Sequence, residues 1–333
     1  MRLPQYLIET FSDFVKNKRP VALVTVLSTK GSTYSKAGSQ MLVGADGSVH
    51  GLLSGGCLEN DLAERAIAAI RSGQADWVEY DLRDDDDVFG LGVGCEGAMR
   101  LQIQPLQPES GYEPFAGWLT QLESAATVDA RFTTAHQEGT AHQEGTVTFH
   151  EEGAKQGKGS KEGTVTFHEG GTVTFVLGRP YAVLLLGAGQ DADPLVQFCR
   201  SLGWRVTVTD HRSAYAARMQ EQCACDSRCI PVAEIGDQVD FDTFDAAIVM
   251  SHHLASDREY LLALAESAIQ FIGLLGPPHR RDRLLDEMGA ARDKLDGRLR
   301  SPVGKRIGGR GPAAIALEVA AELQEYFCEL STD

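Results

Sequence analysis

The sequence lacks a long hydrophobic run and an excess of positive charge. No window approaches the roughly 18 uncharged apolar residues of a transmembrane helix. Lys and Arg number 31 against 47 Asp and Glu, and the resulting net charge of −16 argues against nucleic-acid binding. Residues 1–15 read as an amphipathic helix without the apolar core and cleavage site of a signal peptide. We therefore expect a cytoplasmic protein with neither a membrane nor a nucleic acid as partner.

The sequence also gives no sign of a disulfide framework. Its 7 cysteines are an odd number in a chain without an export signal, which favours reduced thiols. Hydrophobic residues at 43% and charged residues at 23% are ordinary for a globular protein. A length of 333 residues corresponds to about two domains at roughly 100–200 residues each.

Residues 1–110 predict a small mixed α/β domain rich in glycine loops. Residues 21–27 form a β-branched run typical of a buried strand, and Gly44-Ala45-Asp46-Gly47 indicates a hairpin. A helical pattern starts at Leu58 and stops near Gly73, and residues 99–103 alternate as a strand.

Residues 111–178 form a middle segment that opens with a short helical stripe and continues with repeats. The motif GTVTF occurs at 145–149, 163–167 and 171–175. Its alternation suits short strands joined by turns, but the copies are too few and too unevenly spaced for a solenoid. We interpret this segment as an expanded hairpin or a linker between domains.

Residues 179–333 predict a Rossmann-like domain. A continuous apolar strand at 181–186 precedes a glycine loop, and helices alternate with further strands at 205–209, 246–250 and 271–275. Such alternation implies a doubly wound parallel sheet. The fold class is therefore α/β, with a small N-terminal domain and a Rossmann-like C-terminal domain.

Among the local motifs, the segment Ser54-Gly55-Gly56-Cys57-Leu58-Glu59 points most specifically to a functional site. Glycines let the backbone approach a ligand, and a cysteine at the start of a helix gains thiolate character from the helix dipole. Cys57 is thus a candidate nucleophile, sulfur carrier or soft-metal ligand. A small residue at a tight strand–helix turn is the plainer interpretation.

A second glycine-rich loop, GLGVGCEG, contains Cys95. Its cysteine could converge with Cys57 on one site, although the spacing of the two makes no zinc pattern. Gly31-Ser32-Thr33 supplies further backbone and hydroxyl donors for a polar ligand.

Gly187-Ala188-Gly189 begins a dinucleotide-type loop. Asp210 follows about 20 residues later at the end of a strand, where such folds have a ribose-binding carboxylate. Asp191 and Asp193, however, put negative charge where a pyrophosphate would bind, and repulsion opposes that binding. We expect a dinucleotide fold used for another purpose, without NAD(P).

Three other features have both functional and structural interpretations. His252-His253 follows a strand at the ligand-binding edge, with Asp257 close behind, and suits either acid–base chemistry or helix capping. Residues 279–310 carry 10 Lys and Arg against 5 Asp and Glu, which suits a phosphorylated ligand or a solvated surface. The cluster Cys223, Cys225 and Cys229 lacks a fitting fourth ligand for a metal.

Taken together, these residues resemble the XdhC/CoxI family of xanthine dehydrogenase accessory factors. The N-terminal likeness rests on KGSTYSKAGSQMLV, GADGSVHGLLSGGCLE and FGLGVGCEGAMRLQI. The C-terminal likeness rests on LLLGAGQDA, VTVTDHR, MSHHLASDREYLL, FIGLLGPPHRRDRLL and SPVGKRIGGRGPAAIALEVAAEL. It covers most of the chain except about residues 127–176.

The resemblance supplies the candidate cofactor-binding residues, with Cys57 as the candidate metal ligand. Position by position, they are Gly55, Gly56, Cys57 and Glu59 in a GGC-[LV]-E element, Cys95 in a GLGLGC-like element, Gly187 and Gly189 in the glycine loop, and Asp210 and Arg212 in a D-x-R element. Two departures stand out. Glu96-Gly97 replaces a frequent Gly-Gly, and Gln190-Asp191 replaces a frequent His-Val.

The resemblance implies a homodimer that binds molybdenum cofactor transiently. Such a protein supports sulfuration of the cofactor, protects it and delivers it to a xanthine dehydrogenase-type molybdenum hydroxylase. A cysteine desulfurase is a further candidate partner. We expect a non-catalytic cofactor-insertion chaperone rather than an enzyme.

Two alternatives from other classes stay open. One is an NAD(P)-dependent oxidoreductase that uses the loop 187–192, Asp210 and His252. The other is an interaction scaffold whose two domains have lost their ligands.

Overall fold

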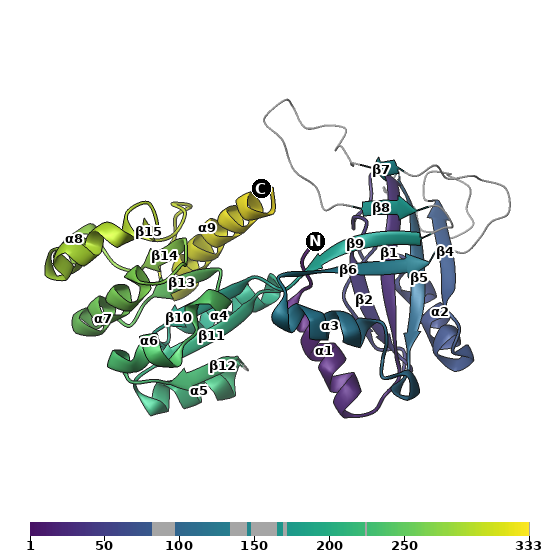
Figure 1. Cartoon of the computed structure of the whole chain (residues 1–333), viewed down its shortest axis with the longest axis horizontal. Coiled ribbons are helices and arrows are strands. Elements are labelled where there is room, and N and C mark those ends of the chain that lie inside the picture. The colour runs from purple at the N-terminus through teal and green to yellow at the C-terminus, as the bar shows by residue number, and fades with distance from the viewer. Residues whose placement is uncertain (82–96, 134–144, 148–164, 169–171, 224, 333) are drawn as a thin grey trace. The chain divides into compact units, whose positions relative to one another are not determined.

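The computed structural model describes residues 1–81, 97–133, 145–147, 165–168, 172–223 and 225–332. It consists of two compact units, Met1–Arg179 and Pro180–Asp333 (Figure 1). The middle segment 111–178 lies in the same unit as residues 1–110.

The N-terminal unit is built on an antiparallel sheet of five strands in the order β3-β2-β1-β5-β4. The strands are β1 (Val21–Gly31), β2 (Gln40–Gly44), β3 (Val49–His50), β4 (Asp76–Asp81) and β5 (Gly97–Leu106). The first seven residues of β1 are buried because both faces of the sheet are covered. The expected strand at 21–27 and the turn at Gly44–Gly47 are confirmed.

Helix α2 (Glu59–Ser72) covers one face of this sheet with Leu62, Ala66 and Ile70. It ends at Gly73, whose φ of 69° is the left-handed conformation that glycine adopts without strain. The opposite face packs against α1 (Gln5–Lys16), α3 (Phe115–Ser124) and a second sheet. A 3₁₀ turn, η1 (Pro108–Ser110), precedes α3.

The second sheet of this unit contains the repeated segments. Its order is β6 (Thr127–Thr133), β9 (Thr172–Gly178), β8 (Val165–His168) and β7 (Gly145–Val147), and all neighbours are antiparallel. Parts of the three GTVTF copies form β7, β8 and β9, as the alternation predicted. Val173 and Phe175 of β9 are buried in the core that α1 and α3 share, so this segment belongs to the packing of the first unit.

The C-terminal unit is a doubly wound parallel sheet, which confirms the expected fold class. Its order is β12 (Asp226–Cys229), β11 (Arg205–Asp210), β10 (Ala182–Leu186), β13 (Ala246–Val249), β14 (Phe271–Leu274) and β15 (Leu299–Arg300). Strand β10 is apolar throughout because its side chains alternate between two buried faces.

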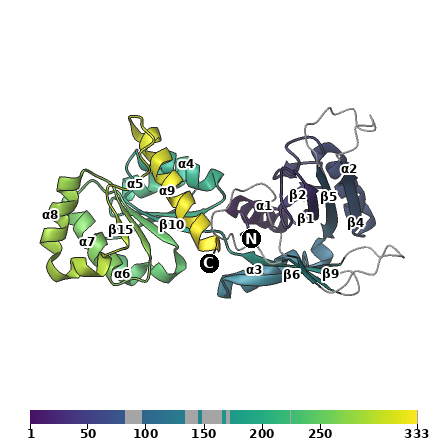
Figure 2. The same cartoon turned by 90° about the horizontal axis from the view of Figure 1, so that it is seen from above.

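Helices cover both faces of the parallel sheet (Figure 2). One layer holds α4 (Ala192–Ser201), α5 (Ser213–Cys223) and α9 (Pro312–Thr332), and the other holds α6 (Ile235–Gln238), α7 (Leu254–Ala265) and α8 (Pro278–Met288). Short 3₁₀ segments are η2 (Val232–Glu234), η3 (Phe241–Thr243) and η4 (Gly289–Leu295). Within the described residues, no helix has the length and hydrophobicity that a membrane crossing requires.

Aromatic packing attaches the last helix to the sheet. Phe327 stacks on Tyr181 at a centroid distance of 4.1 Å and meets Trp204 edge-on at 4.9 Å. The Tyr181 hydroxyl also donates a hydrogen bond of 2.8 Å to the Phe327 carbonyl oxygen. Removal of the Phe327 ring would therefore leave a cavity between α9 and the start of β10.

We predict that Phe327→Ala destabilises the C-terminal unit by about 3–5 kcal/mol, the range for a large aromatic removed from a core. Leu330→Ala in the same helix serves as control because Leu330 is 40% exposed. Urea unfolding followed by circular dichroism measures both. Equal losses in the two variants would contradict this account of the packing.

Candidate functional site

Three segments meet at one end of the N-terminal sheet. Gly31, the last residue of β1, pairs with Gly97, the first of β5, so the loop that follows β1 lies beside the start of β5. A Cβ atom on Gly97 would lie 2.3 Å from the Ser32 carbonyl oxygen, so only glycine fits this approach. Tyr34 from the same loop lies over Gly55. Cys95 lies outside the described residues.

The carboxylate of Glu59 holds the loop that precedes α2. Its Oε1 accepts hydrogen bonds from the backbone N–H of Leu53 at 2.9 Å and of Ser54 at 2.8 Å, and its Oε2 accepts from the Ser54 hydroxyl at 2.5 Å. Ser54 Oγ in turn accepts from Leu58 N–H at 2.8 Å. Burial alone would raise the pKa of Glu59, but the bonds from Ser54 and Leu53 outweigh it and lower the pKa. Glu59 is therefore ionised and directed into the protein.

Held in this way, the loop presents Gly55, Gly56 and Cys57, and we call it the Cys57 loop. The two glycines have φ of 77° and 106°, a region that disfavours other residues. Among the described residues, no hydrogen-bond acceptor partners the backbone N–H groups of these three residues. Cys57 is partly exposed and its thiol is free. A thiol thus lies beside three available donors at the start of a helix, an arrangement that favours an anionic ligand.

The glycine loop of the C-terminal unit follows β10. Gly187 has φ of 128°, and a Cβ atom there would lie 2.6 Å from the Met250 carbonyl oxygen after β13. Only glycine lets the two strand ends approach so closely. Strand β10 is flanked by β11 on one side and β13 on the other, so the loop lies at the topological switch point of the sheet.

Asp210 is already fully engaged within the protein. It is 1% exposed, and it accepts from Ala188 N–H at 2.8 Å and from the backbone N–H of Arg212 at 2.9 Å. The Arg212 guanidinium adds bonds of 2.8 and 2.7 Å, one to each carboxylate oxygen. Burial would raise the pKa of Asp210, but the bonds from Arg212 and Ala188 lower it. In a dinucleotide-binding fold, the carboxylate at this place accepts hydrogen bonds from the ribose hydroxyl groups. In Asp210 the four internal bonds already use the acceptor positions of both oxygens.

The two acidic residues at the start of α4 differ in their partners. Asp193 forms an ion pair with Arg218 at 2.6 Å, and Arg218 also donates to the carbonyl oxygens of Ala188 and Gly189. Asp191 instead lies 2.6 Å from Nε2 of His252, which is 58% exposed. The sequence had indicated the negative charge of both residues but neither of these partners.

His252 is fixed by a buried network behind it. Ser251 donates its backbone N–H and its hydroxyl to Asp257 Oδ1, and Arg280 donates to Asp257 Oδ2 at 2.6 Å. His253 caps α7 by accepting from Ser256 N–H, so the capping interpretation holds for this histidine. The sequence carried no capping-box signal for this network, because Asp257 lies six residues after Ser251 rather than the three that a capping box requires.

The three-cysteine cluster shows no metal geometry. Cys225 is buried, Cys223 is partly buried and Cys229 is exposed. Burial, with a smaller contribution from Cys223, raises the pKa of Cys225 to about 11. No group of three metal-ligating side chains occurs in the part of the chain that the structure describes.

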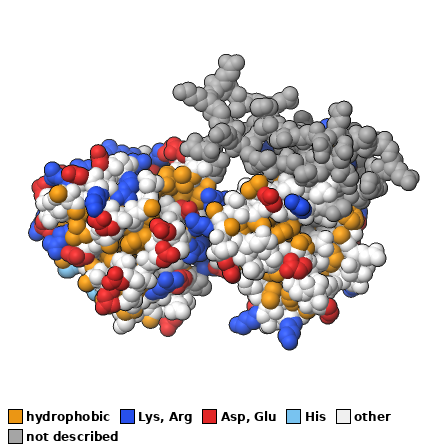
Figure 3. Space-filling view, viewed as in Figure 1, with side chains coloured by type: hydrophobic (Ala, Val, Ile, Leu, Met, Phe, Trp, Pro, Cys, Tyr) orange, Lys and Arg blue, Asp and Glu red, His pale blue; other side chains and the backbone are white. Residues whose placement is uncertain are grey.

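The basic segment 279–310 is largely neutralised by its surroundings. Its pairs include Arg280 with Asp257, Arg281 with Asp282, Arg283 with Glu287 and Lys294 with Glu266. Figure 3 shows acidic and basic side chains interspersed over the viewed face of this unit. Arg306 and Arg310, before α9, have no acidic partner within the described residues.

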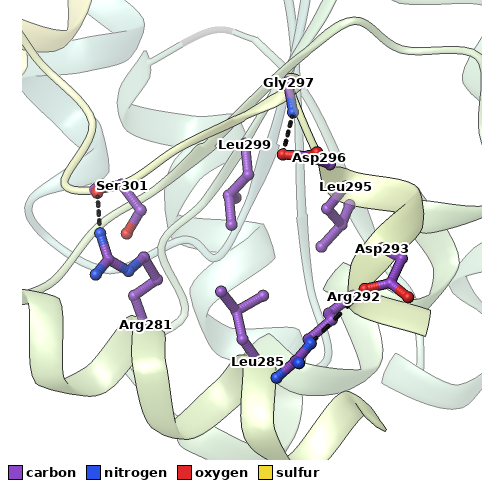
Figure 4. Close-up of a pocket in the computed structure, with 9 residues that line it drawn as sticks. All are labelled: Arg281, Leu285, Arg292, Asp293, Leu295, Asp296, Gly297, Leu299 and Ser301. Carbon is purple, nitrogen blue, oxygen red and sulfur yellow. Dashed lines mark hydrogen bonds and ion pairs between the residues drawn. The ribbon is translucent and has the colours of Figure 1, made fainter. Parts of the chain in front are cut away.

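A cleft of about 470 Å³ lies between α8, η4 and β15 (Figure 4). Leu285, Leu295 and Leu299 line it together with two arginines and two aspartates. Arg292 lies 3.7 Å from Asp293, and Arg281 is bound by Asp282 and by the Ser301 carbonyl oxygen. The charges that line the cleft are balanced, so it does not select an anion by net charge.

Models of known families match both units. The model for the XdhC and CoxI family matches residues 14–81, which include the Cys57 loop, and the model for the XdhC Rossmann domain matches residues 183–323. The chain belongs to the XdhC and CoxI family. The resemblance inferred from the sequence motifs is thereby confirmed.

Relatives match over nearly the whole chain. A protein of Bacillus subtilis, named as a probable xanthine dehydrogenase subunit, is 28% identical over 93% of this chain and 94% of its own length. The molybdenum cofactor insertion chaperone PaoD of Escherichia coli is 25% identical, over 90% of this chain and 81% of its own. A crystal structure described as a xanthine dehydrogenase from Bacillus halodurans has a TM-score of 0.72 at 25% identity, covering 97% of this chain and 96% of that one. Both units of this chain therefore occur together in other members of the family.

Glu59→Gln should destabilise the N-terminal unit by about 2 kcal/mol at neutral pH, because the amide cannot replace a carboxylate that accepts three hydrogen bonds. The lowered pKa makes this contribution complete above the ordinary value of 4.5, and it is lost as the pH falls through the folded-state value. Chemical unfolding of wild type and variant across neutral and acidic pH measures the difference. Glu64→Gln, an exposed site on the same helix, is the control, and a pH-independent difference would refute the assignment.

Proposed function

We propose that this protein binds molybdenum cofactor transiently, supports its sulfuration, protects it and delivers it to a xanthine dehydrogenase-type molybdenum hydroxylase. The observation that carries the proposal is the Cys57 loop, in which a free, partly exposed thiol lies beside backbone donors that have no acceptor among the described residues. The likeness to a molybdenum cofactor insertion chaperone, over 90% of this chain and 81% of that protein, supports it. The protein acts by binding and hand-over, and not as an enzyme.

The Cys57 loop suits the metal end of the cofactor. A thiolate is a soft ligand for molybdenum, and the N–H groups of Gly55, Gly56 and Cys57 stabilise negative charge on oxygen or sulfur. Glu59 acts as a positioning residue because its oxygens are bound inside the loop. Cys95 stays a candidate second thiol at this site.

In the C-terminal unit, Arg306 and Arg310 are placed to attract the terminal phosphate of the cofactor. They belong to the glycine-rich segment before α9, where Gly308, Gly309 and Gly311 have positive φ. Exposed guanidinium groups and a helix start both favour a phosphate. Gly187 and Gly189 shape the other loop of this unit, which Asp210 and Arg212 hold in place.

A cysteine desulfurase supplies the sulfur, the protein forms a homodimer, and it works in the cytoplasm. Free thiols in the described part of the chain agree with a reducing compartment.

We also propose that the Rossmann-like unit does not use NAD(P). The four bonds to Asp210 leave no position for a ribose hydroxyl, and the Asp191 carboxylate lies against Gly189, where a pyrophosphate would have to approach. This distinguishes the chaperone from the oxidoreductase alternative.

Cys57→Ala should reduce the molybdenum and pterin retained per chain at least tenfold, because the variant loses the thiolate ligand but keeps the backbone donors. The measurement mixes pure protein with cofactor released anaerobically from a molybdoenzyme and quantifies both components after gel filtration. Cys229→Ala, an exposed cysteine of the other unit, should retain wild-type amounts. Near-stoichiometric retention by Cys57→Ala would remove Cys57 from the site, and no retention by wild type would remove the chaperone function.

Titration with NADH and NADPH should show no saturable binding below about 1 mM. The Asp191 carboxylate repels the pyrophosphate, and the internal bonds of Asp210 keep it from the ribose. Nucleotide fluorescence at constant ionic strength is the readout. Micromolar binding of either nucleotide would restore the oxidoreductase alternative.

A further inference from the structure

The switch-point crevice of the C-terminal unit contains an acid–base pair where related folds bind phosphate. Asp191 from the start of α4 and His252 from the end of β13 meet there with 2.6 Å between Oδ2 and Nε2. Ligands of doubly wound sheets bind outside the carboxyl ends of the strands, at this point of the topology. The pair therefore occupies the place where a ligand of this unit is expected.

The backbone of His252 shows that its position is enforced. Its φ of 60° is left-handed, which costs energy in a residue other than glycine. Ser251 and the buried Asp257 hold the preceding turn through two hydrogen bonds, and Arg280 neutralises that carboxylate. The fold thus maintains an unfavourable conformation that presents the imidazole ring to Asp191.

One oxygen of Asp191 is available for a ligand. Oδ2 is engaged by His252, whereas Oδ1 has no partner among the described residues and lies above Gly189. A Cβ atom on Gly189 would lie 2.5 Å from Oδ1, so the carboxylate occupies the space over the loop itself. The carboxylate therefore presents a negatively charged acceptor directly over the glycine loop.

Two buried hydroxyl groups at the same sheet edge also lack partners. Thr209 and Tyr260 are fully or nearly fully buried, and neither hydroxyl has a hydrogen bond within the described residues. Burial, and then the charges of Asp210 and Asp257, raise the pKa of Tyr260, so its hydroxyl is within electrostatic reach of both carboxylates.

We propose that this crevice binds the aminopyrimidinone edge of a pterin, with Asp191 accepting the adjacent N–H groups of the ring. Asp191 can accept from two neighbouring N–H donors, one at the free Oδ1 and one at the second lone pair of Oδ2, whose other lone pair faces His252. Its negative charge favours such a heterocycle over the anionic end of the same ligand. Guanine presents the same donor edge. This inference rests on the proposed function for the choice of pterin over guanine, and it assigns the ring to the C-terminal unit.

The test uses the full-length chain and metal-free probes. Pterin and guanosine are titrated by fluorescence and by equilibrium dialysis, with inorganic pyrophosphate as the anionic probe. Wild type should bind pterin saturably below about 1 mM and more tightly than guanosine, and should not bind pyrophosphate. Asp191→Asn should weaken pterin binding at least tenfold, because it replaces a charged acceptor by a neutral amide.

Asp237→Asn is the matched control, since it removes one exposed carboxylate from the same unit and should leave pterin binding unchanged. Equal affinity of wild type and Asp191→Asn, tighter binding of guanosine, saturable binding of pyrophosphate, or no pterin binding would each overturn the inference. Retention of molybdenum by the Cys57 loop is measured separately. Loss of that retention with intact pterin binding would refute the proposed delivery function alone.

Discussion

Buried carboxylates bonded to backbone N–H groups are the constraint on which both candidate sites depend. Glu59, Asp210 and Asp257 are each at most 8% exposed, and each accepts from the backbone of a loop at the end of a strand. An ionised carboxylate survives burial only when donors surround it. Each one therefore fixes its loop in a single conformation, including the left-handed residues that the loop contains.

The groups that do not bond to these carboxylates differ in chemistry between the two units. In the N-terminal unit, Glu59 takes the donors of Leu53 and Ser54, so the following N–H groups and the Cys57 thiol are left for a ligand. In the C-terminal unit, Asp191 places an acceptor over the glycine loop, beside the exposed imidazole of His252. A soft, anionic metal centre suits the first set, and N–H donors of a heterocycle suit the second.

Local pattern was sufficient to predict most of the fold. The β-branched run at 21–27, the alternation in the GTVTF copies and the apolar β10 each reflect burial that neighbouring residues impose. Gly73 ended its helix as predicted because a left-handed cap needs glycine. The candidate site was less predictable, since the His252–Asp191 pair joins residues 61 positions apart and depends on how β10 and β13 lie in the sheet.

The partners also explain why two aspartates of equal charge have unequal consequences. From the sequence, Asp191 and Asp193 are equivalent obstacles to a phosphate at the start of α4. In the fold, the Arg218 guanidinium compensates Asp193 and reaches the glycine-loop carbonyl groups, so that carboxylate is part of the scaffold. Within the described parts of the chain, the exposed His252 is the one partner of the Asp191 side chain, whose other oxygen lies over Gly189. The carboxylate that a ligand meets over this glycine loop is therefore that of Asp191 and not that of Asp193.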